Sequence, residues 1–199
     1  MEIIELLLDE KSELAGIEAI SIVKNGGIES DFIALKSEKI KLAEVDKERK
    51  ILMGAALIPN KPIYRKQGDK EYYVFFSKET IKKASQLFFV NGNQNNATLE
   101  HQMSLSGLSV VESWLVEDTE MDKSKLYDLD LPVGTWAISM KVDNDEIWNE
   151  FVKTGMVNGF SIEGYFVDKA DVKTKTEETK MSEEKANEKL EEIKKLFNQ

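Results

Sequence analysis

Residues 51–58 form the run Ile-Leu-Met-Gly-Ala-Ala-Leu-Ile, which carries no charge and stops at Pro59. A short apolar run bounded by proline is typical of a strand that is covered on both faces in the middle of a sheet. Leaving such a run in water would forfeit about 0.8 kcal/mol for each CH₂ group that folding can bury. We therefore expect residues 1–58 to contribute strands to the same folded unit as the residues that follow.

Alternating apolar residues predict further strands along the chain. These strands are expected at residues 16–23, 71–76, 108–116, 134–142 and 159–166. Ser77 is in the position of an N-cap, and the apolar spacing over residues 80–88 predicts an amphipathic helix. A second, short helix is expected at residues 147–152. These patterns predict an α+β fold that is rich in strands.

The composition changes at about residue 169. Residues 169–181 are almost entirely Lys, Thr, Glu and Asp, which is typical of a linker. Residues 182–199 carry apolar side chains at helical spacing behind Ser182, which predicts a short amphipathic helix for docking or coiled-coil pairing. The expected organisation is one domain over residues 1–168, a charged linker and this helix.

The charge and composition exclude several classes of protein. The chain of 199 residues has a formal charge of −10, which argues against binding nucleic acid or an anionic membrane. It has no cysteine and one histidine, so disulfides, thiol catalysis and an ordinary catalytic zinc site are not expected, and neither is any cofactor. Residues 1–8 lack the basic start of a signal peptide, and we expect a cytoplasmic protein.

Two residues have the chemistry of a nucleophile and its base. His101 follows a polar loop, and Ser161 lies in the run Gly-Phe-Ser-Ile-Glu-Gly at residues 159–164. The bracketing glycines allow the backbone of this segment to approach another closely. A nucleophilic serine needs a base within hydrogen-bonding reach. Spacing alone leaves open whether His101 reaches Ser161, and an ordinary buried serine and a structural histidine are the alternatives.

From about Tyr64 to Phe166 the chain resembles the serine proteases of tailed-phage head modules, a branch of the prohead (capsid maturation) proteases. The resemblance is carried by six blocks in one order: residues 97–101 (Ala-Thr-Leu-Glu-His), 110–114 (Val-Val-Glu-Ser-Trp), 122–126 (Asp-Lys-Ser-Lys-Leu), 134–136 (Gly-Thr-Trp), 141–143 (Lys-Val-Asp) and 159–166 (Gly-Phe-Ser-Ile-Glu-Gly-Tyr-Phe). The wider group is similar to the herpesvirus assemblins, which implies a β-barrel edged by helices.

The resemblance implies that His101 and Ser161 are the catalytic pair, and we expect their side chains to lie about 3 to 5 Å apart. The third member is open, because related enzymes use a second histidine or an acid after the serine. Glu163 is one candidate, since it lies two residues after Ser161 on the same face of the strand. Glu112, on the strand after His101, is another. Glu18 is the third, because residues 16–23 resemble the closing strand of related proteases, as if the barrel were permuted.

The resemblance further implies an endopeptidase that acts inside the phage procapsid in the host cytoplasm. Its substrates would be segments of the scaffold and the major capsid protein, and the chain itself. Dimerisation is expected from the assemblins, and no cofactor is needed. The alternative is a catalytically inactive protease-like protein that serves as a scaffold or capsid-interaction module, which fits the acidic charge and the tail equally well.

Overall fold

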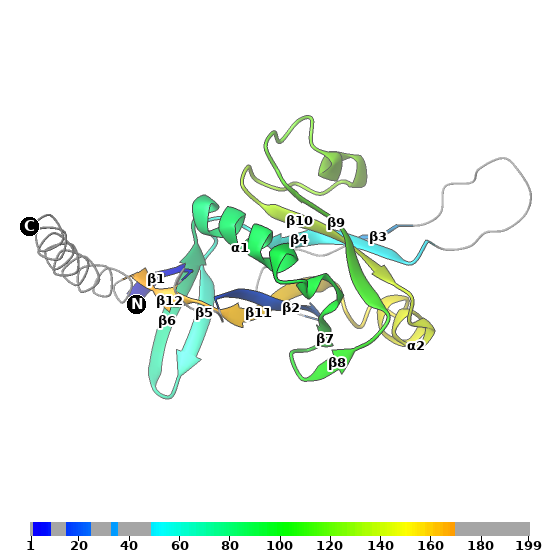
Figure 1. Ribbon diagram of the computed structural model, residues 1–199, viewed down its shortest axis with the longest axis horizontal. Helices are drawn as coiled ribbons and strands as arrows, with labels where there is room; N and C mark the ends of the chain where they lie inside the picture. Colours follow the sequence, from blue (N-terminus) through cyan, green and yellow to red (C-terminus); the bar gives the residue numbers. More distant parts are fainter. Residues whose placement is uncertain (1, 9–14, 25–32, 36–48, 170–199) are drawn as a thin grey trace, which may run out of the picture.

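The fold was analysed in a computed structural model, which describes residues 2–8, 15–24, 33–35 and 49–169. The charged linker beyond Lys169 and the amphipathic helix at 182–199 lie outside these residues. The described part is mostly β-sheet with short helices (Figure 1). Within it, no helix is long and apolar enough to cross a membrane. The described strands form three sheets of four strands each.

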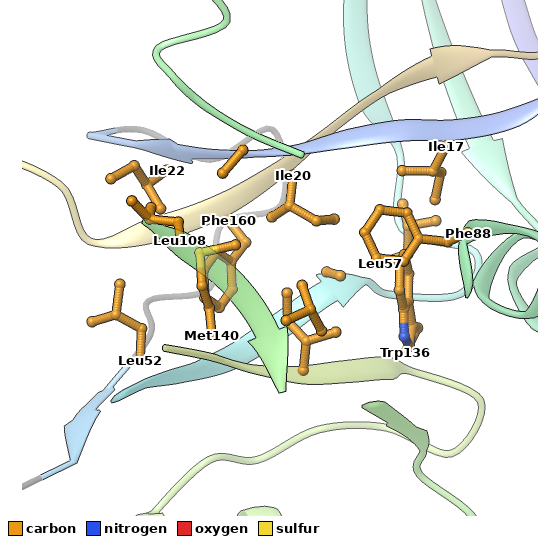
Figure 2. Close-up of a cluster of buried hydrophobic side chains, with 14 of the residues drawn as sticks. Ile17, Ile20, Ile22, Leu52, Leu57, Phe88, Leu108, Trp136, Met140 and Phe160 are labelled. Atoms are coloured by element: carbon orange, nitrogen blue, oxygen red, sulfur yellow. The ribbon is translucent and has the colours of Figure 1, made fainter. Parts of the chain in front are cut away.

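Two of these sheets supply most of the main core, to which the remaining sheet also contributes. One has the strand order β3 (Ile33–Leu35), β4 (Ile51–Leu57), β10 (Trp136–Val142) and β9 (Leu108–Leu115). The other has the order β11 (Gly159–Tyr165), β2 (Gly16–Val23), β7 (Ala97–Leu99) and β8 (Met103–Leu105). Figure 2 shows their apolar side chains meeting between β2 and β11 on one side and β4 and β10 on the other.

Strand β4 is covered on both of its faces, as its uncharged sequence predicts. Leu52 and Leu57 belong to the main core, whereas Met53 and Ala55 belong to a second, smaller apolar cluster. That cluster is completed by the connection between β9 and β10, which contains the 3-10 helix η2 (Lys123–Tyr127) and lies over the outer face of the sheet. The run is therefore a central strand between two apolar layers.

The third sheet has the order β12 (Val167–Asp168), β1 (Glu2–Leu7), β6 (Lys70–Phe76) and β5 (Ile63–Gln67). Strand β1 runs parallel to β6 and antiparallel to β12. Strands from the first 58 residues thus pair with later strands in all three sheets: β1 with β6, β2 with β11, and β4 with β10.

The helices are short and follow their sequence signals. Helix α1 (Lys78–Val90) is capped by Ser77, whose Oγ accepts a hydrogen bond from the Thr80 N–H, so the N-cap is where the sequence predicts it. It is followed by the 3-10 turn η1 (Asn93–Asn95). The second helix consists of α2 (Asp145–Ile147) and the π-helical turn η3 (Trp148–Val152).

The predicted closed barrel is not what the described strands form. The sheets remain open, with β11, β8, β3 and β9 as edge strands of the two core-forming sheets. An apolar alternation shows that one face of a strand is buried, but a barrel and two packed sheets bury that face equally well. The α+β class is correct, and the barrel expectation is wrong for this part of the chain.

Strand β11 passes very close to the start of β2 at Gly164. A Cβ atom at this position would lie 2.1 Å from the Gly16 carbonyl oxygen and 2.8 Å from the Ile17 Cα. The antiparallel register also shifts here, between Glu163 and Gly164. The close approach that the bracketing glycines predict is therefore real at Gly164, and only glycine fits without moving the backbone.

We expect Gly164→Ala to lower the free energy of unfolding by about 3 kcal/mol, because backbone atoms, unlike the end of a side chain, have little room to retreat. Gly155→Ala is the matched control. Gly155, unlike Gly164, has a positive φ, of 70°, and it has open space around it, so only the backbone cost of about 1 kcal/mol is expected there. Urea unfolding of both variants checks the difference, and equal losses would contradict the close approach.

Candidate active site

The candidate site lies on the outer face of the sheet β11-β2-β7-β8. Ser161 on β11 is the register partner of Ser21 on β2, and Ser21 is in turn the partner of Thr98 on β7. Directly paired residues project from the same face of a sheet. The opposite face of β2 carries Ile20 and Ile22, which are fully buried in the core. One face of β2 therefore supports the core and the other carries the polar site.

Small side chains on β2 let residues from the flanking strands meet above it. Glu163 on β11 is paired with Ala19, and Ser161 is paired with Ser21. Because alanine and serine rise little above the sheet, the longer Glu163 side chain crosses over β2. Its carboxylate accepts a hydrogen bond from Thr98 Oγ1 on the far side.

Glu163 also binds the only histidine of the chain. The His101 Nδ1 atom lies 3.1 Å from Glu163 Oε1, and the two side chains are 41% and 32% exposed. With Thr98 and His101 both directed at one carboxylate oxygen, the orientation of the carboxylate is set by two contacts. A carboxylate on Nδ1 fixes the tautomer of a neutral imidazole, with the proton on Nδ1 and an accepting lone pair on Nε2.

His101 lies in a tight turn between β7 and β8. The turn is closed by a hydrogen bond of 3.0 Å from the Gln102 N–H to the Leu99 carbonyl oxygen. Glu100 and His101 both have positive φ angles, 51° and 58°, the pattern of a type I′ turn. That turn favours Asn-Gly, and other residues in the left-handed region cost of order 1–3 kcal/mol each. Two such residues in succession form a strained turn, which contacts with neighbouring residues must stabilise.

Hydrogen bonds from β2 hold this turn in place. The His101 N–H donates to Ser21 Oγ at 3.0 Å, and the Glu100 N–H donates to the Ile22 carbonyl oxygen at 3.1 Å. The Glu100 carboxylate accepts a further bond of 2.6 Å from the Lys24 N–H. Ser21 is fully buried, so its contact with His101 is shielded from competing water. The strained backbone that aims the imidazole is thus fixed to the middle strand of the sheet.

Ser161 is half-buried beside this arrangement. It precedes Glu163 by two residues on β11, so its Cα lies roughly 7 Å from that of Glu163 along the strand. Its register partner Ser21 binds the backbone of His101. The hydrogen bonds that position His101 run to Ser21 and Glu163, and the pairing of His101 with Ser161 stays a prediction.

The three acids proposed as third member lie in different places. Of these three acids, Glu163 is the one whose carboxylate is hydrogen-bonded to His101. Glu112 is on β9 of the other core-forming sheet, where its carboxylate accepts bonds of 2.5 Å from Lys123 and from buried Ser139. Glu18 lies on β2 opposite the register shift of β11, and its carbonyl oxygen accepts a bond from Asn96. Glu112 therefore supports the packing of the β9–β10 connection.

Two further residues of the site, Ser21 and Thr98, do not follow from the sequence analysis. Ser21 is an ordinary polar residue in an apolar strand, which sequence reasoning assigns to a neutral buried hydroxyl. Thr98 directly precedes Leu99 in the block that ends at His101, but nothing in its own pattern points to Glu163. Knowledge of the strand register would have identified them, because Ser21 and Thr98 lie side by side with Ser161 on adjacent strands.

A serine, a histidine and a carboxylate on one exposed sheet face are the residue types of a serine hydrolase site. A family model described as "Putative phage serine protease XkdF" matches residues 39–170, well over half of the chain. The chain belongs to this family of phage proteins. A search of curated proteins and a search of solved structures each found no match. The matched range contains His101, Ser161 and Glu163, whereas β2 with Ser21 precedes it.

We expect His101→Gly to be more stable than His101→Ala by about 1 kcal/mol. Both variants lack the imidazole, so the comparison isolates the cost of a left-handed φ for a residue with a Cβ atom. Thermal unfolding of the two proteins side by side measures this difference. Equal stabilities would show that the turn imposes no such strain.

Hydrogen bonds from Lys123, and next from Ser139, lower the pKa of Glu112 below its usual range. A depressed folded-state pKa adds stability above the unfolded value of about 4.3, and that stability is lost as pH falls through the folded value. Glu112→Gln should therefore unfold more easily than wild type at pH 7, by less than about 1 kcal/mol. The gap should close below about pH 4. The exposed Glu117→Gln is the control, and a gap that persists in acid would contradict the assignment.

Proposed function

We propose that the chain is a serine endopeptidase in which Ser161 is the nucleophile, His101 the general base and Glu163 the acid that orients His101. The observation that carries the proposal is the contact of 3.1 Å between His101 Nδ1 and Glu163 Oε1. It supports an imidazole whose Nε2 is free to accept a proton. The membership of a phage serine protease family supports the same reading.

In this mechanism Ser161 Oγ attacks the carbonyl carbon of the scissile peptide bond while its proton passes to His101 Nε2. The Glu163 carboxylate stabilises the imidazolium that forms, and Thr98 holds this carboxylate in place. His101 then gives the proton to the leaving amine, and the acyl group stays on Ser161 Oγ. A water molecule, deprotonated by His101, releases the acid product and restores the serine.

The substrates that fit this family are segments of the scaffold and of the major capsid protein, with cleavage inside the procapsid in the host cytoplasm. Self-cleavage and a dimeric active form belong to the same proposal. They rest on the resemblance of the six sequence blocks to prohead proteases, and the description of the matching family adds only a phage serine protease.

The rival function is an inactive protease-like scaffold or capsid-interaction protein. A scaffold has no need for a strained backbone at His101 or for a carboxylate held by two contacts. The positive φ of His101 and its hydrogen bond to Glu163 therefore favour the enzyme.

The test is labelling of the purified full chain with a fluorophosphonate, which reacts with an activated serine, together with cleavage of capsid and scaffold proteins. We expect a single label on Ser161. Ser161→Ala or His101→Ala should lower cleavage by roughly 10⁴-fold or more, and Glu163→Gln by roughly 10²-fold or more.

The matched control is Ser104→Ala, an exposed serine on β8 in the same row as Ser161, Ser21 and Thr98. It should leave labelling and cleavage unchanged. Label on another serine, or cleavage that survives Ser161→Ala, would overturn the assignment. Absence of both label and cleavage in the wild-type chain would favour the scaffold.

A further inference from the structure

A polar pocket lies at the end of the sheet beyond Glu163. Its volume is about 560 Å³, and it is lined by residues 15–18 of the chain around the start of β2 on one side. On the other side it is lined by Asn91, Asn93 and Asn96, which follow helix α1. The mechanism proposed above uses none of these residues.

The pocket opens next to the candidate active site. Asn96 directly precedes β7 and lies two residues before Thr98. Glu18 lies on β2 between the partners of Glu163 and Gly164. It is three residues from Ser21, the partner of Ser161, which corresponds to roughly 10 Å along the strand. A peptide bound at Ser161 therefore reaches the pocket within a few residues.

Hydrogen bonds within the lining occupy three side-chain N–H groups, one of Asn93 and two of Asn96. Asn93 Nδ2 donates to the Ile17 carbonyl oxygen at 2.9 Å. Asn96 Nδ2 donates to the Glu18 carbonyl oxygen at 3.0 Å and to Asn93 Oδ1 at 3.1 Å, so both of its N–H bonds are used. The polar side-chain groups that remain for a ligand include the Asn96 oxygen and the Glu18 carboxylate, and both accept hydrogen bonds.

Helix α1 adds negative potential to the same pocket. The helix ends at Val90, and its C-cap residue Asn91 is part of the pocket lining. The C-terminus of a helix carries a partial negative charge of about half an electron. The last turn of α1 contains no basic residue that would offset it. The C-terminal end of helix α1 and the Glu18 carboxylate therefore both favour a cation in the pocket.

We propose that this pocket is a substrate subsite that takes a lysine or arginine side chain, with Glu18 as the specificity-determining residue. The inference rests on the proposed peptidase function and names a feature of its substrate. A cationic side chain offers only donors, which matches the acceptors of the lining. An extended peptide covers roughly 10 Å in three residues, so the cationic residue lies about three residues from the bond that is cut.

The first test measures binding and does not need activity. The full chain carrying Ser161→Ala, labelled with ¹⁵N, is titrated with N-acetyl-lysine N-methylamide and with its uncharged norleucine analogue. We expect the lysine compound to shift the Glu18 backbone amide and the Asn93 and Asn96 side-chain amides, and the norleucine compound to leave them unchanged. Added salt should weaken the binding.

Two variants set the size of the effect. Glu18→Gln should weaken binding of the lysine compound by roughly two- to fivefold. Asn91→Asp, which adds a second carboxylate to the lining, should strengthen it by a similar factor. Glu117→Gln, an exposed acid far along the chain from the lining residues, is the control and should change nothing. Equal shifts with both compounds, or no response to Glu18→Gln, would overturn the inference.

The second test uses the wild-type chain and a peptide library. Lysine or arginine should be enriched about three residues from the cut bond, and the enrichment should fall in Glu18→Gln. Cleavage without this preference would contradict the proposed subsite but would still support the peptidase function. If the pocket binds lysine but the chain cuts no peptide, the result would contradict the peptidase function and support the cation preference of the pocket.

Discussion

The pairing of β2 with β11 and β7 is the constraint on which both the core and the candidate site depend. One face of β2 places Ile20 and Ile22, fully buried, between the two packed sheets. The other face carries Ala19 and Ser21, whose small size lets Glu163 cross the strand. A shift of one residue in this register would exchange the two faces. The apolar contacts of the core therefore fix the register that brings the polar residues together.

The residues of the candidate site are positioned in two different ways. Glu163 and Ser161 share one strand, so the pleat sets their spacing without any further contact. The imidazole comes from a turn two strands away, where its position has to be imposed. Ser21 Oγ holds the backbone of His101 by accepting a hydrogen bond from its N–H. Glu163 then orients the imidazole ring through its contact with Nδ1. A strained backbone conformation persists only where the surrounding contacts hold it in place, and such residues cluster at functional sites.

The sequence predicted individual elements better than their assembly. The uncharged run at 51–58, the N-cap at Ser77 and the strand that contains Ser161 are local features, and the structure confirms them. The barrel expectation failed because closure depends on which strands become edges, and a strand pattern carries no such information. For the acid, Glu163 was one of three candidates. The sequence left the three open, and the position of His101 separates Glu163 from Glu112.

The place of β2 also bears on how the chain can be processed. A propeptide that included β2 would take Ser21 away from His101 and remove the strand that joins β11 to β7. It would also remove Ile20 and Ile22 from the core, and burial of each such side chain is worth about 1.5–3 kcal/mol. The remaining chain would lack both the strand that supports the candidate site and part of the core. Any self-cleavage compatible with an active product must therefore leave β2 between β11 and β7, either still linked to the chain or held by the sheet alone.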